Sequence, residues 1–240
     1  MEIAPRIRRV GDDSIVNAYI VEDGGEITIV DAGLSGLWTN LPTELAAMGR
    51  TLEDVRSIVL THGHSDHIGF AERGRTERGW PVRIHELDAA LARGEVPNPA
   101  RGGDPTRPLP MIRFLWWTLR HGRRTRPLGE VATYGDGATL DVPGSPRVTL
   151  VPGHTPGSAV LYFPGHDALF VGDALCTYAV TTGRTGPQVA PFSADRELAL
   201  ASLSRIQWID AGLVLPGHGP AWTGGTAGAV RAALLAARRA

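Results

Sequence analysis

The segment VRSIVLTHGHSDH, residues 55–67, joins a run of β-branched residues to a cluster of three histidines and one aspartate. The β-branched run predicts a short buried strand that stops at Gly63, where glycine gives the backbone freedom to turn. Because side chains alternate along an extended chain, His62 and His64 fall on the same side and can hold one metal ion. The end of this strand therefore predicts a site at the edge of a sheet.

The chain offers more metal ligands than one ion needs. Asp66 and His67 are adjacent in sequence, so their side chains diverge and can point toward a second, nearby ion. A catalytic zinc takes about three protein ligands, whereas seven suit two ions that share one carboxylate. Imidazole and carboxylate together suit zinc, iron or manganese. The seven candidate ligands are His62, His64, Asp66, His67, His154, Asp173 and His218.

The first third of the chain reads as strands, which then alternate with helices. The strands at 14–23 and 26–33 flank Gly24-Gly25, which predicts a hairpin. We expect further strands at 55–63, 81–85, 147–154, 159–165, 167–174 and 212–218, and helices at 37–48, 67–79, 86–93, 195–210 and 225–240. IVDAGL at 29–34 and VGDAL at 171–175 each place an aspartate just after a hydrophobic strand, as two halves of a sandwich would.

The composition favours a folded protein and argues against several other classes. Apolar residues make up 42% of the chain, and the formal net charge of −1 gives no general attraction to nucleic acid. No apolar run approaches the roughly 18–20 residues that span a bilayer, and the N-terminus lacks the apolar core of a secretory signal. Cys176 is the one cysteine, which excludes a disulfide within the chain and fits a reducing compartment. We therefore expect a cytoplasmic protein whose residues 1–240 form one domain, with no nucleic-acid partner and no transmembrane segment.

Residues 94–128 interrupt the alternating pattern as an insert that is dense in proline and arginine. The insert contains the aromatic run LPMIRFLWWTLR, residues 109–120. One interpretation is a helix packed on the core, and another is a lid over the metal site. A homodimer contact through 109–119 is a third, because aromatic residues and Met are favoured at interfaces. A membrane-surface element is a fourth, because tryptophans lie beside the arginine cluster at 120–126.

Five short motifs occur in an order that identifies a family. THGHSDH matches the H-x-H-x-D-H signature of the metallo-β-lactamase superfamily, which the chain resembles. The other four motifs are VDAG at 30–33, PGHTPGS at 152–158, VGDA at 171–174 and PGHG at 216–219. The resemblance implies a four-layer αββα sandwich, with two mixed β-sheets flanked by helices and the site among loops at one edge.

The resemblance also implies a role for each motif residue. The ligands of the first ion would be His62, His64 and His154, those of the second Asp66, His67 and His218, with Asp173 bridging both ions and Asp31 supporting the histidines. The ions would be two divalent metals, Zn²⁺ before Fe or Mn. Asp173 favours the branch of thioesterases, glyoxalase II-like enzymes and lactonases, because true β-lactamases of this fold generally lack that bridging residue.

The expected activity is hydrolysis of a carboxylic ester, thioester or lactone by a metal-bridging hydroxide, with a small acyl compound as substrate. Asp66 would orient the nucleophile or pass a proton to the leaving group. Tyr178 would donate a hydrogen bond to the substrate carbonyl, as a tyrosine does in related lactonases. Two alternatives remain open. One is a phosphodiesterase or ribonuclease, which the arginine cluster at 120–126 supports, and the other is a metal-binding module without catalysis.

Overall fold

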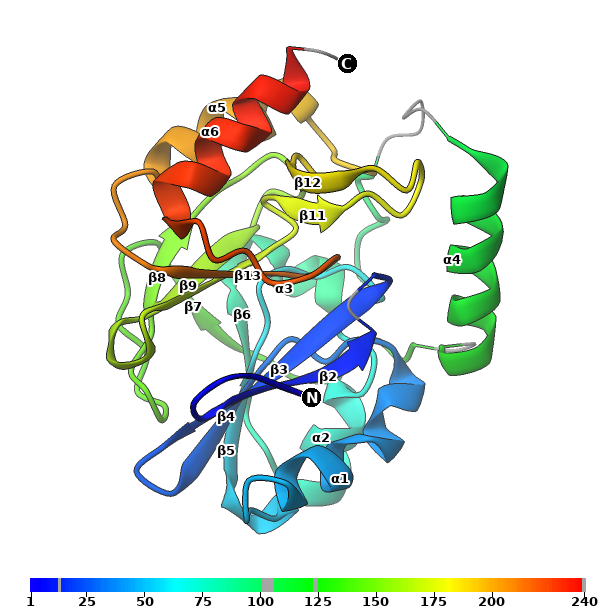
Figure 1. The fold of residues 1–240 in the computed structure, drawn as a ribbon. Helices are drawn as coiled ribbons and strands as arrows, with labels where there is room; N and C mark the ends of the chain where they lie inside the picture. The colour runs from blue at the N-terminus through cyan, green and yellow to red at the C-terminus, as the bar shows by residue number, and fades with distance from the viewer. Residues whose placement is uncertain (13, 101–105, 123–124, 239–240) are drawn as a thin grey trace.

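A seven-stranded mixed sheet forms the N-terminal half of the computed structural model, which describes residues 1–12, 14–100, 106–122 and 125–238 (Figure 1). Its strands lie in the order of the chain: β1 (Glu2–Ala4), β2 (Ile7–Asp12), β3 (Val16–Asp23), β4 (Glu26–Val30), β5 (Val55–Val59), β6 (Val82–His85) and β7 (Ala132–Tyr134). β1 to β4 pair antiparallel, and β4 to β7 pair parallel. The predicted hairpin is confirmed, because Asp23 at the end of β3 pairs with Glu26 at the start of β4.

A four-stranded mixed sheet forms the second half of the sandwich. Its order is β13 (Leu213–Pro216), β10 (Ala168–Gly172), β9 (Ala159–Phe163) and β8 (Arg147–Leu150). β10 and β13 are parallel, whereas β9 is antiparallel to both of its neighbours, so β8, β10 and β13 all run in one direction. A small separate hairpin consists of β11 (Cys176–Tyr178) and β12 (Thr185–Gln188).

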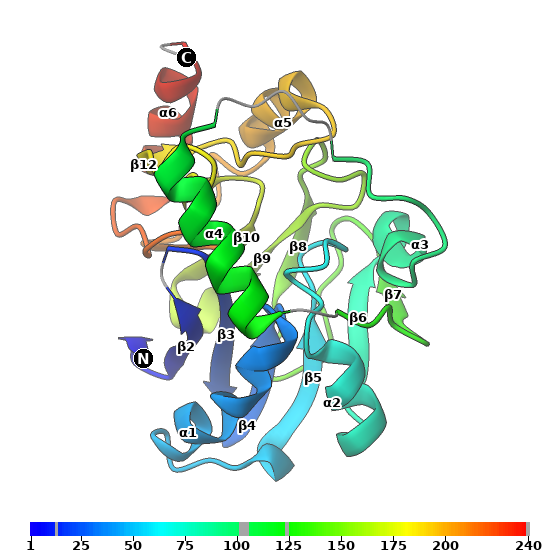
Figure 2. The same ribbon diagram turned by 90° about the vertical axis from the view of Figure 1, so that its right-hand side faces the viewer.

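The helices lie on the outer faces and in the connections (Figures 1 and 2). The α-helices are α1 (Leu41–Ala46), α2 (Ala71–Arg78), α3 (Ala89–Ala92), α4 (Pro108–His121), α5 (Arg196–Ser202) and α6 (Gly225–Ala237). Short 3-10 helices are η1 (Ser35–Thr39), η2 (Leu52–Asp54), η3 (Glu86–Asp88), η4 (Pro164–His166) and η5 (Leu203–Arg205). No helix among the described residues is both long and apolar enough to pass through a bilayer.

Alternation along the buried strands produces the layers. In β4 and β5, Val30 and Val59 join the core between the two sheets, while Ile29 and Ile58 join the core under α1 and α2. In β10, Phe170 faces the core between the sheets and Leu169 faces the core under α5 and α6. Each central strand is therefore apolar on both faces. The predicted sandwich of two mixed sheets with outer helices is confirmed.

The helix predicted for 67–79 starts later than expected, and that part of the prediction is wrong. α2 begins at Ala71, because the His67 carbonyl and the N–H groups of Gly69 and Phe70 form hydrogen bonds with residues 32–33 of the loop after β4. The Gly69 N–H donates to the Gly33 carbonyl, and a Cβ at Gly69 would lie 2.2 Å from that same oxygen. Close backbone contact thus replaces the first turn of the expected helix. Arg123, Arg124 and the last two residues of the predicted C-terminal helix lie outside the described residues.

Candidate metal centre

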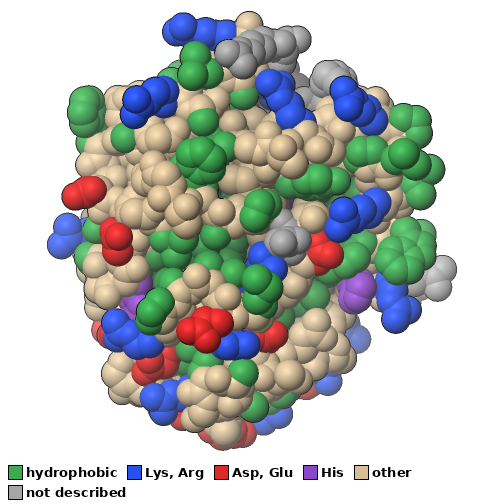
Figure 3. All heavy atoms as spheres, viewed as in Figure 1, with side chains coloured by type: hydrophobic (Ala, Val, Ile, Leu, Met, Phe, Trp, Pro, Cys, Tyr) green, Lys and Arg blue, Asp and Glu red, His purple; other side chains and the backbone are tan. Residues whose placement is uncertain are grey.

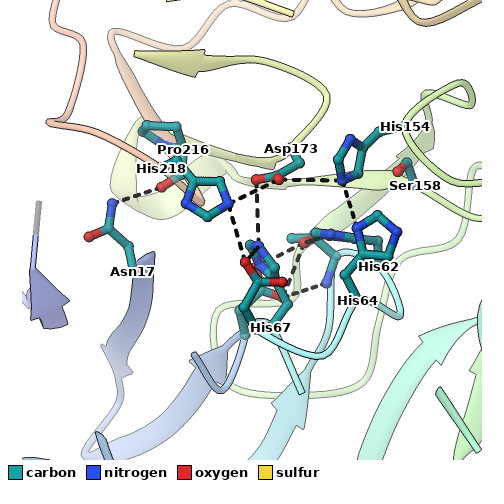
Figure 4. A network of polar contacts seen from close by, with 12 residues as sticks. Asn17, His62, His64, His67, His154, Ser158, Asp173, Pro216 and His218 are labelled. Carbon is teal, nitrogen blue, oxygen red and sulfur yellow. Dashed lines mark hydrogen bonds and ion pairs between the residues drawn. The ribbon is translucent and has the colours of Figure 1, made fainter. Parts of the chain in front are cut away.

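The seven candidate ligands come from four strand ends that meet at one edge of the sandwich (Figure 4). His62, His64, Asp66 and His67 follow β5 in the first sheet. His154, Asp173 and His218 follow β8, β10 and β13, three strands of the second sheet that run in the same direction. Because parallel strands end at the same edge, residues more than 150 positions apart in sequence are brought together.

The first group consists of His62, His64 and His154, whose ligand atoms lie within 4.8 Å of one another. His64 Nδ1 is 2.8 Å from His154 Nε2. All three rings are buried, and burial lowers the pKa of each, to about 3 for His154 despite the nearby charge of Asp173. These imidazoles are therefore neutral near pH 7, which is the form that binds a metal ion.

The second group consists of Asp66, His67 and His218, again within 4.8 Å. His218 Nε2 lies 3.5 Å from Asp66 Oδ2, and His67 Nε2 lies 4.0 Å from the same oxygen. Burial by itself lowers the pKa of His67, but the charges of Asp173, Asp66 and Asp31 outweigh it and raise the pKa to about 10. The pKa of His218 is also raised, since the carboxylate of Asp173 outweighs burial.

Asp173 lies between the two groups and contacts both (Figure 4). Its Oδ2 is 3.3 Å from His154 Nε2 and 3.2 Å from His218 Nε2, while Oδ1 is 3.5 Å from His67 Nε2. Burial alone would raise the pKa of this carboxyl, yet the surrounding histidines hold it well below its usual value. The Asp173 carboxylate therefore lies within 3.5 Å of ligand atoms from both groups.

Several buried polar atoms of this cluster face it without a hydrogen-bond partner among the described residues. They are Nε2 of His62, His64 and His67 and Oδ1 of Asp173. An unpartnered buried polar atom costs free energy unless something satisfies it. Imidazole nitrogens and a carboxylate oxygen form a donor set that suits a divalent transition metal. The residues present therefore fit a divalent metal.

Asp31 holds the ring of His67 in place. Its Oδ2 lies 3.0 Å from His67 Nδ1, which leaves Nε2 free to face Asp173, and its Oδ1 accepts a hydrogen bond from Thr61 N–H at 2.7 Å. Asp31 directly follows β4 with φ of 59°, a left-handed conformation that aspartate tolerates better than most residues. The role of Asp31 as a support for the histidines stays a prediction, which this contact with His67 favours.

The loop that carries His218 is anchored by the first sheet. His218 Nδ1 contacts the carbonyl of Ile15, and Asn17 Nδ2 donates to the carbonyls of Pro216 and Gly219 at 3.1 and 2.9 Å. Tyr19 Oη donates to the Pro216 carbonyl at 2.7 Å. These contacts connect residues 15–19, in and just before β3, to residues 216–219. The local sequence around residues 15–19 does not predict them.

Asp88 is the functional residue that sequence reasoning missed. It is fully buried at the end of η3, and its Oδ2 accepts hydrogen bonds from Gly63 N–H at 2.8 Å and Thr155 Oγ1 at 2.7 Å. Its Oδ1 accepts from Gly157 N–H at 2.6 Å. One carboxylate therefore connects the loop of His62 and His64 to the loop of His154. The only sequence signal was an acidic residue in a segment expected to be helical.

A cavity of about 330 Å³ opens onto the cluster. Five of the candidate ligands line it: His64, Asp66, His154, Asp173 and His218. The walls include Leu34, Val180 and Phe192 and, from the predicted insert, Asn98, Ala100, Phe114, Thr118 and Thr125. The insert thus supplies part of a largely apolar wall around the polar cluster, a combination typical of small-molecule sites.

Tyr178 is not among the residues that line this cavity. Its backbone N–H lies 3.4 Å from the His218 carbonyl, but its hydroxyl lies beside Gly183, where a Cβ would be 3.7 Å away. Among the described residues, no hydrogen bond connects that hydroxyl to the seven candidate ligands. The role of Tyr178 as a hydrogen-bond donor to the substrate stays a prediction.

We expect the affinity of the second group for a divalent ion to rise with pH up to about pH 10. In the metal-free protein His67 keeps its second ring proton below its pKa of about 10, and that proton must leave before Nε2 can bind a metal. Each pH unit below that value therefore weakens apparent binding at least tenfold, because His218, whose pKa is also raised, must lose a proton as well. Competition with a chromophoric chelator at several pH values measures this slope. An affinity that is flat between neutral and mildly alkaline pH would contradict it.

Comparison with known proteins places the chain among metallo-hydrolases. The family model described as "Metallo-beta-lactamase superfamily" matches residues 11–218. The uncharacterized protein YobT of Bacillus subtilis is 31% identical over 66% of this chain and 61% of its own length. A hydroxyacylglutathione hydrolase of Anaeromyxobacter dehalogenans is 30% identical over 88% of this chain and 63% of its own length. The chain thus spans less than two thirds of each of these relatives.

A solved structure also matches along nearly the whole chain. TTHA1623 in a di-iron-bound form is 26% identical, with a TM-score of 0.64, over 95% of this chain and 98% of that protein.

Proposed function

The chain belongs to the metallo-β-lactamase superfamily, and we propose that it is a hydrolase that uses two divalent metal ions to cleave a carboxylic ester, thioester or lactone. One observation carries the proposal. Asp173 lies within 3.5 Å of histidines from both candidate ligand groups, in a cluster where four buried side-chain atoms lack a hydrogen-bond partner among the described residues.

The proposed ligands divide as the two groups do. His62, His64 and His154 would hold one ion, Asp66, His67 and His218 the other, and Asp173 both. When bound, the ions would supply Lewis acidity at the substrate carbonyl and an activated water near neutral pH. Zn²⁺ is our first choice, with iron and manganese as alternatives, and the di-iron form of TTHA1623 supports both the pair of ions and iron.

Side chains at or near the cavity would transfer the proton, position the histidines and contact the acyl chain. Asp66 is partly exposed at the cavity, so its free oxygen can accept a proton from the attacking water and return it to the leaving group. Asp31 and Asp88 keep the histidines in place. Phe114, Val180 and Phe192 offer an apolar wall to an acyl chain and exclude water from it.

We favour a carboxylic ester, thioester or lactone bond because of one similar protein, the hydroxyacylglutathione hydrolase, and because of the residues that line the cavity. The hydroxyacylglutathione hydrolase is named for the cleavage of an acyl glutathione, which is a thioester. The described arginines of the cluster at 120–126, Arg120 and Arg126, line a different cleft beside α2 and not the cavity over the metal-ligand cluster. A phosphodiester substrate thus gains no support from their positions.

A substrate panel with metal analysis tests the proposal. The purified protein is loaded with Zn²⁺, Fe²⁺ or Mn²⁺, its ions are counted, and turnover is measured on thioesters, lactones, aryl esters, phosphodiesters and a β-lactam. We expect two ions per chain and turnover of at least one carboxylic ester, thioester or lactone, abolished by a chelator and restored by metal. Cleavage of phosphodiesters alone, or full metal loading without turnover of any compound, would refute it.

A further inference from the structure

Helix α4 presents an apolar face to solvent. Five large apolar side chains of this helix are each more than half exposed, from 52% for Leu115 to 81% for Leu109. They are Leu109, Ile112, Leu115, Trp116 and Leu119. Figure 3 shows hydrophobic side chains gathered over α4 at the right-hand edge of the molecule, with basic side chains beside them. Monomeric proteins seldom expose so many large apolar residues on one element.

The exposed residues form a stripe and not a scatter. At about 100° per residue, the five side chains fall within an arc of about 120° of the helix surface. Arg113 and Arg120, both exposed and seven residues apart, follow one edge of the stripe. The opposite side of the helix packs against the protein through Trp117, which is buried, and Phe114.

The charged residues of α4 and of the segments on either side of it have one sign. Every charged residue between Asp104 and Glu130 is an arginine, and the described ones, Arg107, Arg113, Arg120 and Arg126, are exposed. Arg113 has an acidic neighbour, Asp12, at 3.7 Å. The other face of α4 adds no acidic residue. The surface therefore combines an apolar stripe, an exposed tryptophan and positive charge.

We propose that α4 docks this protein on an anionic lipid surface, with the apolar stripe among the acyl chains and the arginines at the phosphate headgroups. Helices that lie in a membrane interface have this division of apolar and basic residues. Anionic lipids also supply the negative charge that α4 itself lacks. The net charge of −1 for the whole chain means that attraction depends on this local cluster.

A second copy of the chain fits the same surface less well. A two-fold contact is formed by the same patch on both subunits. Two α4 stripes would therefore bring Arg113 and Arg120 of each copy to an interface whose helices carry no acidic residue. Like charges without a partner disfavour such a contact.

Docking through α4 would also place the proposed active site near the lipid. Phe114 and Thr118, on the packed side of the helix, line the cavity over the cluster. The cavity would then lie within roughly one helix diameter, ~10 Å, of the headgroups. This consequence for the substrate rests on the proposed function, whereas lipid binding itself does not.

Vesicle sedimentation with the full chain tests the proposal. We expect the protein to sediment with vesicles of equal parts phosphatidylcholine and phosphatidylglycerol, more weakly with phosphatidylcholine alone, and less as salt is raised. The double variant Ile112→Ser/Trp116→Ser should bind at least tenfold more weakly, because two large apolar side chains no longer leave water. Arg120→Glu should weaken binding about tenfold.

Trp208→Ser is the matched control, since Trp208 is 85% exposed but lies outside α4. It should bind as the unchanged protein does. Circular dichroism confirms that each variant is folded, and none of the altered residues lines the cavity. No sedimentation with anionic vesicles, or equal binding by Ile112→Ser/Trp116→Ser, would overturn the proposal. So would a dimer in light scattering that this double variant dissociates, which would make the stripe a contact between copies.

Discussion

Asp173→Asn is expected to lower hydrolytic turnover about a thousandfold, equivalent to about 4 kcal/mol in the activation barrier. The substitution keeps the shape of the side chain but removes the charge that lies 3.2 to 3.5 Å from His154, His218 and His67. Without that charge, two closely spaced cations would repel each other with less compensation. We therefore expect the metal content to fall from two ions per chain to one or none.

Metal analysis and turnover on the substrate of the unchanged protein measure the two effects separately. Asp141→Asn, at an exposed aspartate, is the control and should leave both values unchanged. Loss of turnover with two ions retained would assign Asp173 to the reaction and not to metal binding. Retention of both ions and of full turnover would end the proposed function as we state it.

Asp88→Ala should lower the free energy of unfolding by about 3 kcal/mol, because Gly63 N–H, Thr155 Oγ1 and Gly157 N–H would lose their buried acceptor. In a chain of this size the loss corresponds to a decrease in melting temperature of roughly 6–12 °C. Because Asp88 connects the loops of His62, His64 and His154, we also expect weaker binding of the first ion and turnover about 10- to 100-fold lower.

Asp88→Asn separates the effect of losing the carboxylate's hydrogen bonds from the effect of losing the volume of the side chain. It fills the same space and keeps one acceptor oxygen, so its stability should lie between those of Asp88→Ala and the unchanged protein. Asp141→Ala, at the exposed control position, should melt at the original temperature. If Asp88→Ala melts there too, with metal affinity intact, the carboxylate does not hold the two loops.

The sequence predicted correctly those elements whose formation depends on residues adjacent in the chain. Buried strands such as β5 and β10 were visible because their β-branched and apolar residues run together, and the β3–β4 hairpin was visible from Gly24-Gly25. The start of α2 was mispredicted because backbone groups of His67, Gly69 and Phe70 form hydrogen bonds with the distant loop at 32–33. Helical propensity says nothing about such a competing partner.

The insert shows the same division. The sequence left four roles open for its aromatic segment. The segment could pack on the core, cover the metal site, form a homodimer contact or lie on a membrane surface. The apolar residues of α4 are distributed around the helix, and only packing decides which of them are buried. In the structure Phe114 and Trp117 turn inward while Trp116 and Leu119 stay exposed, which makes one helix both a wall of the cavity and an unpartnered surface.

The sequence by itself determined the identity and order of the candidate ligands, since histidine and aspartate at strand ends beside glycine form motifs that can be read locally. It also indicated Asp31, which belongs to such a motif. Only the tertiary structure decided that Asp88 joins two loops, that Ile15 supports His218, and that Asp173 lies between both groups. These contacts connect residues between 19 and 203 positions apart. They depend on how two sheets pack, and sheet packing is set by the whole core and not by the residues it brings together.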